Sequence, residues 1–330
     1  LSLPPMSFQN IPEPQILRLL PNSQPIAPPE PADLRQQRVD EFLAARSLAP
    51  KSQKAYREDL ARFMTWTDTA WSQVTPRQVA QFKTDLLRLN PDNGKRVLSD
   101  ASVKRILQTL KNFYNWMQLS GYLDRNPTYG ISLPKLPEPE ANHLTDSQVK
   151  AIFQAASDST LCERNLALLS VLLHGLRAQE AANLNVGDFD GQRVKIRQAK
   201  ADSKGTVPLD LEAQMWVNHY LQWRAAQGEM LTEESPLFTS HSNRNQGQRM
   251  GYHAIQKLMK AIAAKVGFDF HAHQFRHTFA TNLILNGMNP YHAMTLTRHK
   301  SPQTFRRYTL AADELAAEQA FRSLNSQVER

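Results

Sequence analysis

The amino-acid sequence predicts a mainly α-helical protein with a small antiparallel β-sheet. Apolar residues recur every three to four positions through residues 33–130, which is the period of amphipathic helices. In the second half of the chain, the apolar run at residues 166–173 predicts a buried helix. Residues 193–197 and 206–209 instead have a strand-like pattern, and the turn between them predicts a β-hairpin.

Residues 33–132 are predicted to form a small first domain of four helices. The third helix is expected to begin at Thr75-Pro76, a pair that suits a helix N-terminus, and the fourth to end at Ser120-Gly121. The fourth helix has the clearest apolar stripe. The apolar residues that indicate the four helices are Leu34, Val39, Phe42 and Leu43; Tyr56, Leu60, Phe63 and Met64; Val79, Phe82 and Leu86; and Val103, Ile106, Leu107, Leu110, Phe113, Tyr114 and Met117.

Proline-rich segments border this domain on both sides. Residues 1–32 hold nine of the twenty prolines, so we expect an extended or disordered arm there. Residues 133–142 (LPKLPEPEAN) contain three prolines and no helical pattern, which predicts an interdomain linker. Thr145 and Gln148 then have the spacing of a capping box, so a second domain, residues 143–330, is expected to open with a helix.

The chain is basic, and most of the excess charge lies in the first domain. The formal net charge is +8, and residues 33–130 hold 16 Lys and Arg against 10 Asp and Glu. Such an excess favours a polyanionic partner, although solvated helix faces explain any single residue equally well. The candidate contacts to a DNA backbone are Lys51, Lys54, Arg57, Lys95, Arg96, Lys104, Arg105 and Lys111.

Two further features of the composition concern the compartment. No apolar run approaches the ~18 residues that a membrane-spanning helix needs, so we expect a soluble protein. The single cysteine, Cys162, cannot form an internal disulfide, which fits the reducing cytoplasm.

The stretch from Phe270 to Leu310 holds five histidines, four arginines and two tyrosines. His273 and Arg276 stand three positions apart, on one face of a helix, so both can contact a single ligand. Because an arginine fork matches the oxygens of phosphate or carboxylate, that ligand is expected to be an anion. Tyr308 follows two arginines and is a candidate nucleophile, although a lone tyrosine is more often structural.

A metal site is the competing interpretation of the histidines. His271, His273 and His277 lie close together in the sequence. Neither they nor the single cysteine has a standard zinc-ligand spacing, so no metal and no other cofactor are predicted.

The order of these residues behind a basic helical domain closely resembles the tyrosine recombinase (phage integrase) family, most of all its two-domain Xer-type members. The resemblance covers roughly residues 33–325. It implies a SAM-like four-helix DNA-binding domain and a catalytic domain with a C-terminal helix. The implied catalytic residues are Arg177, Lys200, His273, Arg276, His299 and Tyr308.

Four motifs carry the resemblance. Gly175-Leu176-Arg177-x-x-Glu180 is similar to the first arginine motif, and His273-x-x-Arg276-His277 to the second box. His299 and Tyr308, nine residues apart, have the spacing of the third box, and Lys200, eight residues before Pro208, matches the strand lysine.

The sequence departs from the family pattern at two places. Where relatives commonly have Leu-Gly-His, this chain has Thr297-Arg298-His299, and where they have Gly-Lys-Gly it has Ala199-Lys200-Ala201. The missing glycines leave the local backbone geometry of both segments open.

The resemblance implies site-specific DNA recombination without metal or ATP. Tyr308 would attack a phosphodiester and form a 3′-phosphotyrosyl link, with His273 helping to remove its proton. Arg177 and Arg276 would bind the non-bridging oxygens, and His299 would add a hydrogen bond. Lys200 would protonate the 5′-oxygen that leaves, with Lys204 as its nearest rival. Glu180 is expected to orient Arg177 or to cap the local structure.

The implied partner is double-stranded DNA that carries the target sites. The resemblance also implies that four protomers assemble on this DNA, and that the protein is found in the bacterial cytoplasm, associated with the nucleoid. Docking of the C-terminal helix, residues 311–330, on a neighbouring protomer is expected to support that tetramer, and the alternative is a helix folded back on its own domain. Two other functions remain open: a type IB topoisomerase, which uses the same chemistry on one duplex, and a non-catalytic DNA-binding regulator.

Overall fold

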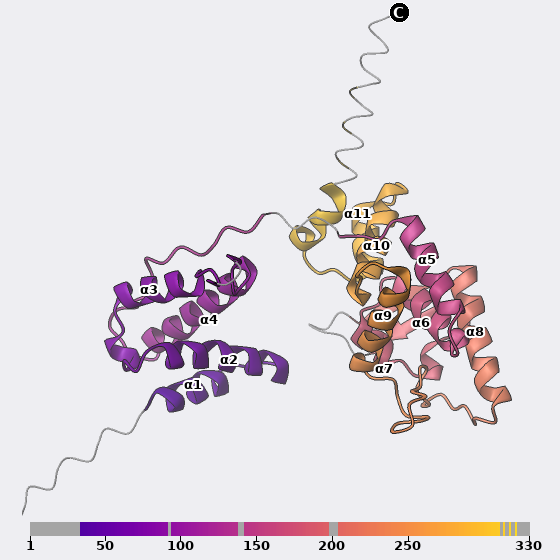
Figure 1. The fold of residues 1–330 in the computed structure, drawn as a ribbon, viewed down its shortest axis with the longest axis horizontal. Coiled ribbons are helices and arrows are strands. Elements are labelled where there is room, and N and C mark those ends of the chain that lie inside the picture. Colours follow the sequence, from indigo (N-terminus) through magenta and orange to yellow (C-terminus); the bar gives the residue numbers. More distant parts are fainter. Residues whose placement is uncertain are drawn as a thin grey trace, which may run out of the picture. The chain divides into compact units, whose positions relative to one another are not determined.

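The computed structural model describes residues 34–91, 94–137, 142–197 and 204–310, together with residues 313, 317 and 321. The chain divides into two compact units, with the boundary between Leu136 and Pro137 (Figure 1). Three predicted features lie outside the described residues: the arm at residues 1–32, the strand lysine Lys200, and nearly all of the tail after Leu310.

Unit 1 contains four α-helices, as the apolar pattern predicts. They are α1 (Leu34–Ala44), α2 (Pro50–Trp66), α3 (Pro76–Leu86) and α4 (Asp100–Leu119), with a 3-10 turn, η1 (Trp71–Gln73), between α2 and α3. Thr75 begins α3 as expected, because its hydroxyl accepts the backbone N–H of Gln78. Helix α4 contacts the other three helices and supplies the centre of the core.

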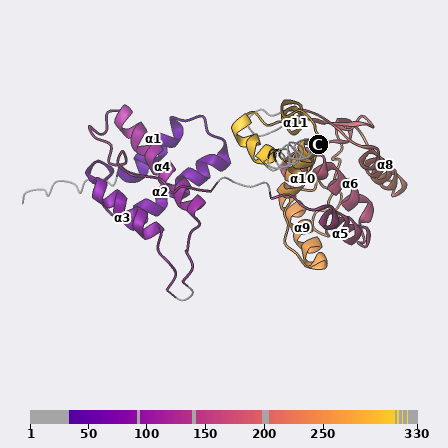
Figure 2. The ribbon, with the colours of Figure 1, turned by 90° about the horizontal axis from the view of Figure 1, so that it is seen from above.

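The core of unit 1 is rich in aromatic rings. Phe113 packs edge-on against Phe42 at 5.3 Å between ring centroids and lies 4.5 Å from the Trp71 ring. The indole N–H of Trp71 is satisfied, since it donates to the carbonyl of Arg35 at 3.0 Å. Between α3 and α4, residues 87–91 and 94–99 project away from the helices as two arms (Figure 2). A β-bridge between Leu89 and Arg96 joins the arms, and we call these residues the two-armed loop.

Unit 2 is built around α6, which contacts α5, α7, α8 and α10. Residues 166–172 of α6 are all buried, which confirms the predicted core helix. The elements of unit 2 are α5 (Asp146–Ser157), α6 (Cys162–Leu173), α7 (Ala178–Asn183), η2 (Val186–Asp188), β1 (Arg193–Ile196), β2 (Gly205–Pro208), α8 (Leu211–Ala226), α9 (Tyr252–Val266), α10 (Ala272–Leu285) and α11 (Pro290–Thr297), and residues 302–310 are also helical.

The two strands form the predicted antiparallel hairpin, with Arg193 opposite Pro208 and Ile196 opposite Gly205. Strand β1 ends one residue before its predicted end at residue 197. Strand β2 begins and ends one residue earlier than the predicted range 206–209. Arg197 lies beyond β1, and its guanidinium pairs with the buried carboxylate of Asp188. Among the described residues, no helix is long and apolar enough to cross a membrane.

Candidate active site

Five of the six predicted site residues lie in unit 2 on segments that the structure describes. Arg177 immediately precedes α7, His273 and Arg276 are on α10, His299 follows α11, and Tyr308 is in the helical segment 302–310. Helices α10 and α11 contact each other, which brings the last four of these residues into one neighbourhood. The position of Lys200 is not described.

A row of four aromatic rings forms the centre of the site. The ring centroids of His273 and His277 are 4.6 Å apart, and the His277 ring lies 5.4 Å from that of Tyr308. On the other side of the phenol, the ring of His299 is 5.5 Å away. Tyr308 is only 2% exposed, because it also packs on Phe305 and on the apolar side of α10. The tyrosine is therefore held between two histidines.

Arg276 is fully buried and joins three segments of the site. Its Nη1 donates to the carbonyl of Gly175 at 2.6 Å, and its Nη2 donates to the carbonyl of Thr297. Gly175 has φ of +81°, and a Cβ there would lie 2.6 Å from the ring of Phe279, so only glycine fits. Arg276 thus fastens α10 to the loops that carry Arg177 and His299.

Arg177 is held by Glu180. Its Nη1 donates to Oε1 at 2.6 Å, and its backbone N–H donates to Oε2 at 2.9 Å. Glu180 therefore both orients the arginine and caps α7, as the sequence leads us to expect. Burial alone would raise the pKa of this carboxyl, but the charges of Arg298 and Arg177 outweigh it and lower the pKa. The carboxylate is charged at neutral pH.

The three histidines of the row are neutral at pH 7. Desolvation by the surrounding protein, followed by the charge of Arg276, lowers the pKa of His273 to about 4 and that of His299 to about 3, although His273 is an exposed residue. Burial beside His273 lowers the pKa of His277 to about 4. Burial also lowers the pKa of Arg276, to about 9, and raises that of Tyr308 against the opposing charges of nearby arginines. Neutral imidazoles beside an uncharged phenol are able to accept its proton.

The hydrogen bonds of Thr297 fix the tautomer of His299. The Thr297 hydroxyl donates its one proton to the carbonyl of Ala293 at 2.7 Å, so it accepts the N–H of His299 Nδ1, also at 2.7 Å. The neutral ring therefore leaves Nε2 as an acceptor. It can donate to a phosphate oxygen, as the sequence interpretation expects, only after it gains a second proton.

The residues weighed as a metal site are not arranged as one. Among the described residues, no group of three or more His, Cys, Asp or Glu side chains could hold a metal ion, and His271, His273 and His277 are all described.

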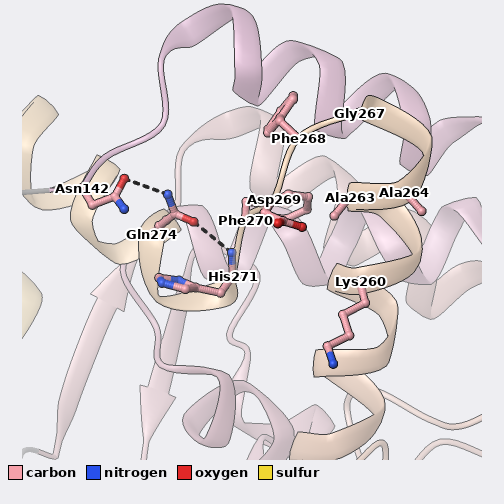
Figure 3. Close-up of a pocket in the computed structure, with 10 residues that line it drawn as sticks. All are labelled: Asn142, Lys260, Ala263, Ala264, Gly267, Phe268, Asp269, Phe270, His271 and Gln274. Carbon is pink, nitrogen blue, oxygen red and sulfur yellow. Dashed lines mark hydrogen bonds between the residues drawn. The ribbon is translucent and has the colours of Figure 1, made fainter. Parts of the chain in front are cut away.

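A cavity of about 810 Å³ lies at the start of α10, between Lys260 of α9, Asn142 and Gln274 (Figure 3). None of the five predicted site residues that the structure describes lines it.

The predicted DNA contacts of unit 1 lie on α2, α4 and the two-armed loop. Several are paired within the unit: Arg57 with Asp40, Arg96 with Asp100, and Arg105 with the buried Asp59, while Lys54 lies 3.9 Å from Glu58. The pairs between exposed side chains contribute little to stability, whereas Arg105 binds a buried carboxylate. The role of these residues therefore remains a prediction.

Two protein-family models and several known recombinases match most of this chain. The model of the phage integrase family matches residues 142–314, and that of the N-terminal SAM-like domain of phage integrases matches residues 37–121. Tyrosine recombinase XerD of Pseudomonas aeruginosa is 30% identical over 285 residues, which cover 82% of this chain and 91% of the relative. Tyrosine recombinase XerC of Vibrio atlanticus is 27% identical over 281 residues, covering 82% and 86%.

A solved structure, that of a lambda integrase tetramer bound to a Holliday junction, has the same fold. It aligns with a TM-score of 0.64 at 20% identity and covers 83% of this chain and 76% of the other. The predicted fold class is confirmed: a SAM-like helical domain precedes an integrase domain with a small antiparallel sheet.

Proposed function

The chain belongs to the phage integrase family of tyrosine recombinases, and from that premise we propose that it cuts and rejoins DNA through a covalent bond between Tyr308 and a 3′ phosphate. The observation that carries this proposal is the position of the phenol. Tyr308 packs between two neutral histidines, and the charges of Arg276, Arg307 and Arg177 act on it. A nucleophile needs such a nearby base, and a phosphate needs such cations.

The attacking oxygen must first lose its proton. Because burial raises the pKa of Tyr308, the phenol does not ionise by itself at neutral pH. We assign the proton to His273, which is neutral and exposed. The His277 ring lies between the two, and Tyr308 is almost fully buried, so DNA must displace the phenol from this packing before it reacts.

The scissile phosphate would be bound by the arginines. Attack by Tyr308 places additional negative charge on the non-bridging oxygens, and Arg177 and Arg276 offset it. An entering phosphate would also raise the pKa of His299, because an adjacent anion stabilises the imidazolium. Its Nε2 could then donate the hydrogen bond that the neutral tautomer cannot supply.

The 5′-oxygen must be protonated as it leaves, and Lys200 is our candidate for the acid. Lys200→Ala should cleave an ordinary phosphodiester slowly but recover on a 5′-bridging phosphorothiolate, since a thiolate leaves without a proton. Lys204→Ala, from the same turn, is the matched control and should show little defect on either substrate. The reverse pattern would assign the role to Lys204.

We propose duplex target DNA and three further copies of the chain as the partners. The lambda integrase of similar fold was solved as a tetramer bound to a Holliday junction, which supports a tetramer of this chain on two target sites. The basic residues of α2, α4 and the two-armed loop would follow the DNA backbone. Docking of the C-terminal segment on a neighbouring protomer remains a proposal, and truncation after Leu310 should weaken strand exchange while preserving binding to one site.

The proposal is tested by covalent trapping on a suicide duplex that carries a nick near the scissile phosphate. The wild-type chain should form an SDS-resistant adduct in excess EDTA, because arginines supply the positive charge. Tyr308→Phe should form none and still bind DNA, whereas Tyr291→Phe, which alters an exposed tyrosine of α11, should react normally. An adduct formed by Tyr308→Phe would contradict the assignment. Joining of ends from two different duplexes distinguishes recombination from topoisomerase activity.

A further inference from the structure

The residue before His299 is an arginine in a backbone conformation that favours glycine. Arg298 has φ of +55° and ψ of +42°, and no other non-glycine residue among those described has a positive φ. A side chain in this conformation is strained. We therefore expect the contacts of the Arg298 side chain to offset the backbone strain at this residue.

These contacts lie inside the site. The side chain of Arg298 is only 4% exposed. Its Nη2 donates to Oε2 of Glu180 at 2.7 Å and to the carbonyl of Gly175 at 3.3 Å, and its Nη1 donates to the carbonyl of Leu296 at 3.1 Å. The carbonyl of Gly175 is also the acceptor for Arg276. Arg298 thus shares one partner with each of the two arginines assigned to the phosphate.

Glu180 is consequently held from two sides. Arg177 binds Oε1 and Arg298 binds Oε2, so the carboxylate plane is fixed by two guanidinium groups at once. The two arginines differ in exposure, since the side chain of Arg177 is 30% exposed and that of Arg298 is buried. Of these two arginines, Arg177 has the guanidinium that is open to a ligand, and Arg298 lies behind it.

The same side chain also touches the β-hairpin. A Cβ built on Gly205, the first residue of β2, would lie 3.2 Å from Cδ of Arg298. Helix α11 and β2 are in contact at this point. The strand that follows the hairpin turn is therefore packed against Arg298, with little room for any residue larger than glycine.

We propose that Arg298 is a positioning residue: by holding Glu180 and the carbonyl of Gly175, it sets the orientation of Arg177 toward the scissile phosphate. This inference rests on the proposed function, in which Arg177 binds that phosphate. Arg298 does not touch the DNA itself. Its loss should leave a folded protein that binds DNA and cleaves it slowly.

The direct test is a double-mutant cycle on single-turnover cleavage. Arg298→Gly suits the backbone conformation and removes the side chain, so it should slow cleavage about tenfold to hundredfold, with DNA affinity nearly unchanged. In an Arg177→Ala background the same change should cost about twofold or less, because its effect passes through Arg177. An equal loss in both backgrounds would overturn the proposal.

Two further variants keep the test decisive. Arg193→Ala removes an exposed arginine that pairs with Asp190 at the far end of β1, and it should cleave at the wild-type rate. If Arg298→Gly lowers the unfolding midpoint, the cycle is repeated with Arg298→Lys, which keeps a buried cation but cannot bind Glu180 and Gly175 as a fork. A wild-type chain without any covalent adduct would refute the proposed function, whereas a normal adduct and a normal Arg298→Gly rate would refute this inference alone.

Discussion

Both units pack aromatic rings together, but the rings differ in their chemistry and in their polar groups. In unit 1 the rings are mostly hydrocarbon, and the polar groups at their edges have partners: Trp66 Nε1 donates to Asp85 at 2.6 Å, and the Tyr114 hydroxyl donates to the carbonyl of Trp71 at 3.3 Å. In unit 2 the row from His273 to His299 consists of ionisable rings. It packs partly on apolar side chains such as Phe305, and the buried Arg276 joins the segments that carry it.

The difference shows in the buried polar atoms that lack a hydrogen-bond partner. Among the described residues all such side-chain atoms lie in unit 2, and four of the five are in or beside α10 and α11: Arg276 Nε, His277 Nδ1, Thr281 Oγ1 and Arg298 Nε. Each costs about 1–3 kcal/mol relative to a satisfied group. The buried side-chain atoms without a partner thus gather around the candidate site of unit 2, whereas the described part of unit 1 contains none.

The largest expected effect is on the stability of unit 1. Phe113→Ala would open a cavity at the centre of the aromatic core and should lower the free energy of unfolding of unit 1 by about 3–5 kcal/mol. Urea unfolding followed by tryptophan fluorescence measures it. Leu119→Ala, which truncates an exposed residue of the same helix, is the control and should change little. A loss below about 1 kcal/mol at Phe113 would mean that the rings do not hold the unit together.

In unit 2 the corresponding change should affect the reaction more than the fold. Arg276→Lys keeps the charge, but an ammonium cannot bridge the carbonyls of Gly175 and Thr297 in the way the fork does. We expect single-turnover cleavage to fall about a hundredfold, or roughly 3 kcal/mol in transition-state stabilisation. DNA affinity should stay within a few fold. Equal losses in affinity and rate would show that Arg276 binds the ground state as strongly as the transition state.

The smallest effect concerns pH. The folded pKa of His277 is about 4, well below the ordinary value of 6.5, so the unfolded chain takes up its proton first as the pH falls. This histidine therefore costs stability progressively from about pH 7 towards pH 4. His277→Phe should lose roughly 1–2 kcal/mol less than wild type between pH 7 and pH 5, measured by urea unfolding. His292→Phe, at an exposed position of α11, should keep the wild-type slope.

Much of this contrast could be predicted from the sequence. The apolar stripe that includes Phe113 and the cap at Thr75 identify the helices of unit 1, because helical periodicity and capping are local properties. The spacing of His273, Arg276, His299 and Tyr308 identifies the motifs of the site in the same way. The matched family models confirm the family, while the roles of the individual residues remain proposals.

The contacts between distant segments could not be predicted. The bond from Arg298 to Glu180 spans 118 positions, and the sequence shows only that an arginine stands where glycine is usual. The tautomer of His299 depends on how Thr297 uses its single proton, which follows from the geometry of α11 and not from residue order. The ends of the two strands were wrong by one residue, because they depend on how the two segments pair, from Arg193 with Pro208 to Ile196 with Gly205, and the local pattern does not give this.

The most direct measurement is the identity of the residue that becomes linked to DNA. Wild-type protein trapped on a suicide duplex is digested with trypsin, and the peptide that retains nucleotides is sequenced by mass spectrometry. We predict the peptide that begins at Tyr308, after cleavage at Arg307, with the 3′ phosphate esterified to the phenol. Attachment to another residue, or to a 5′ phosphate, would contradict the central claim that Tyr308 is the nucleophile.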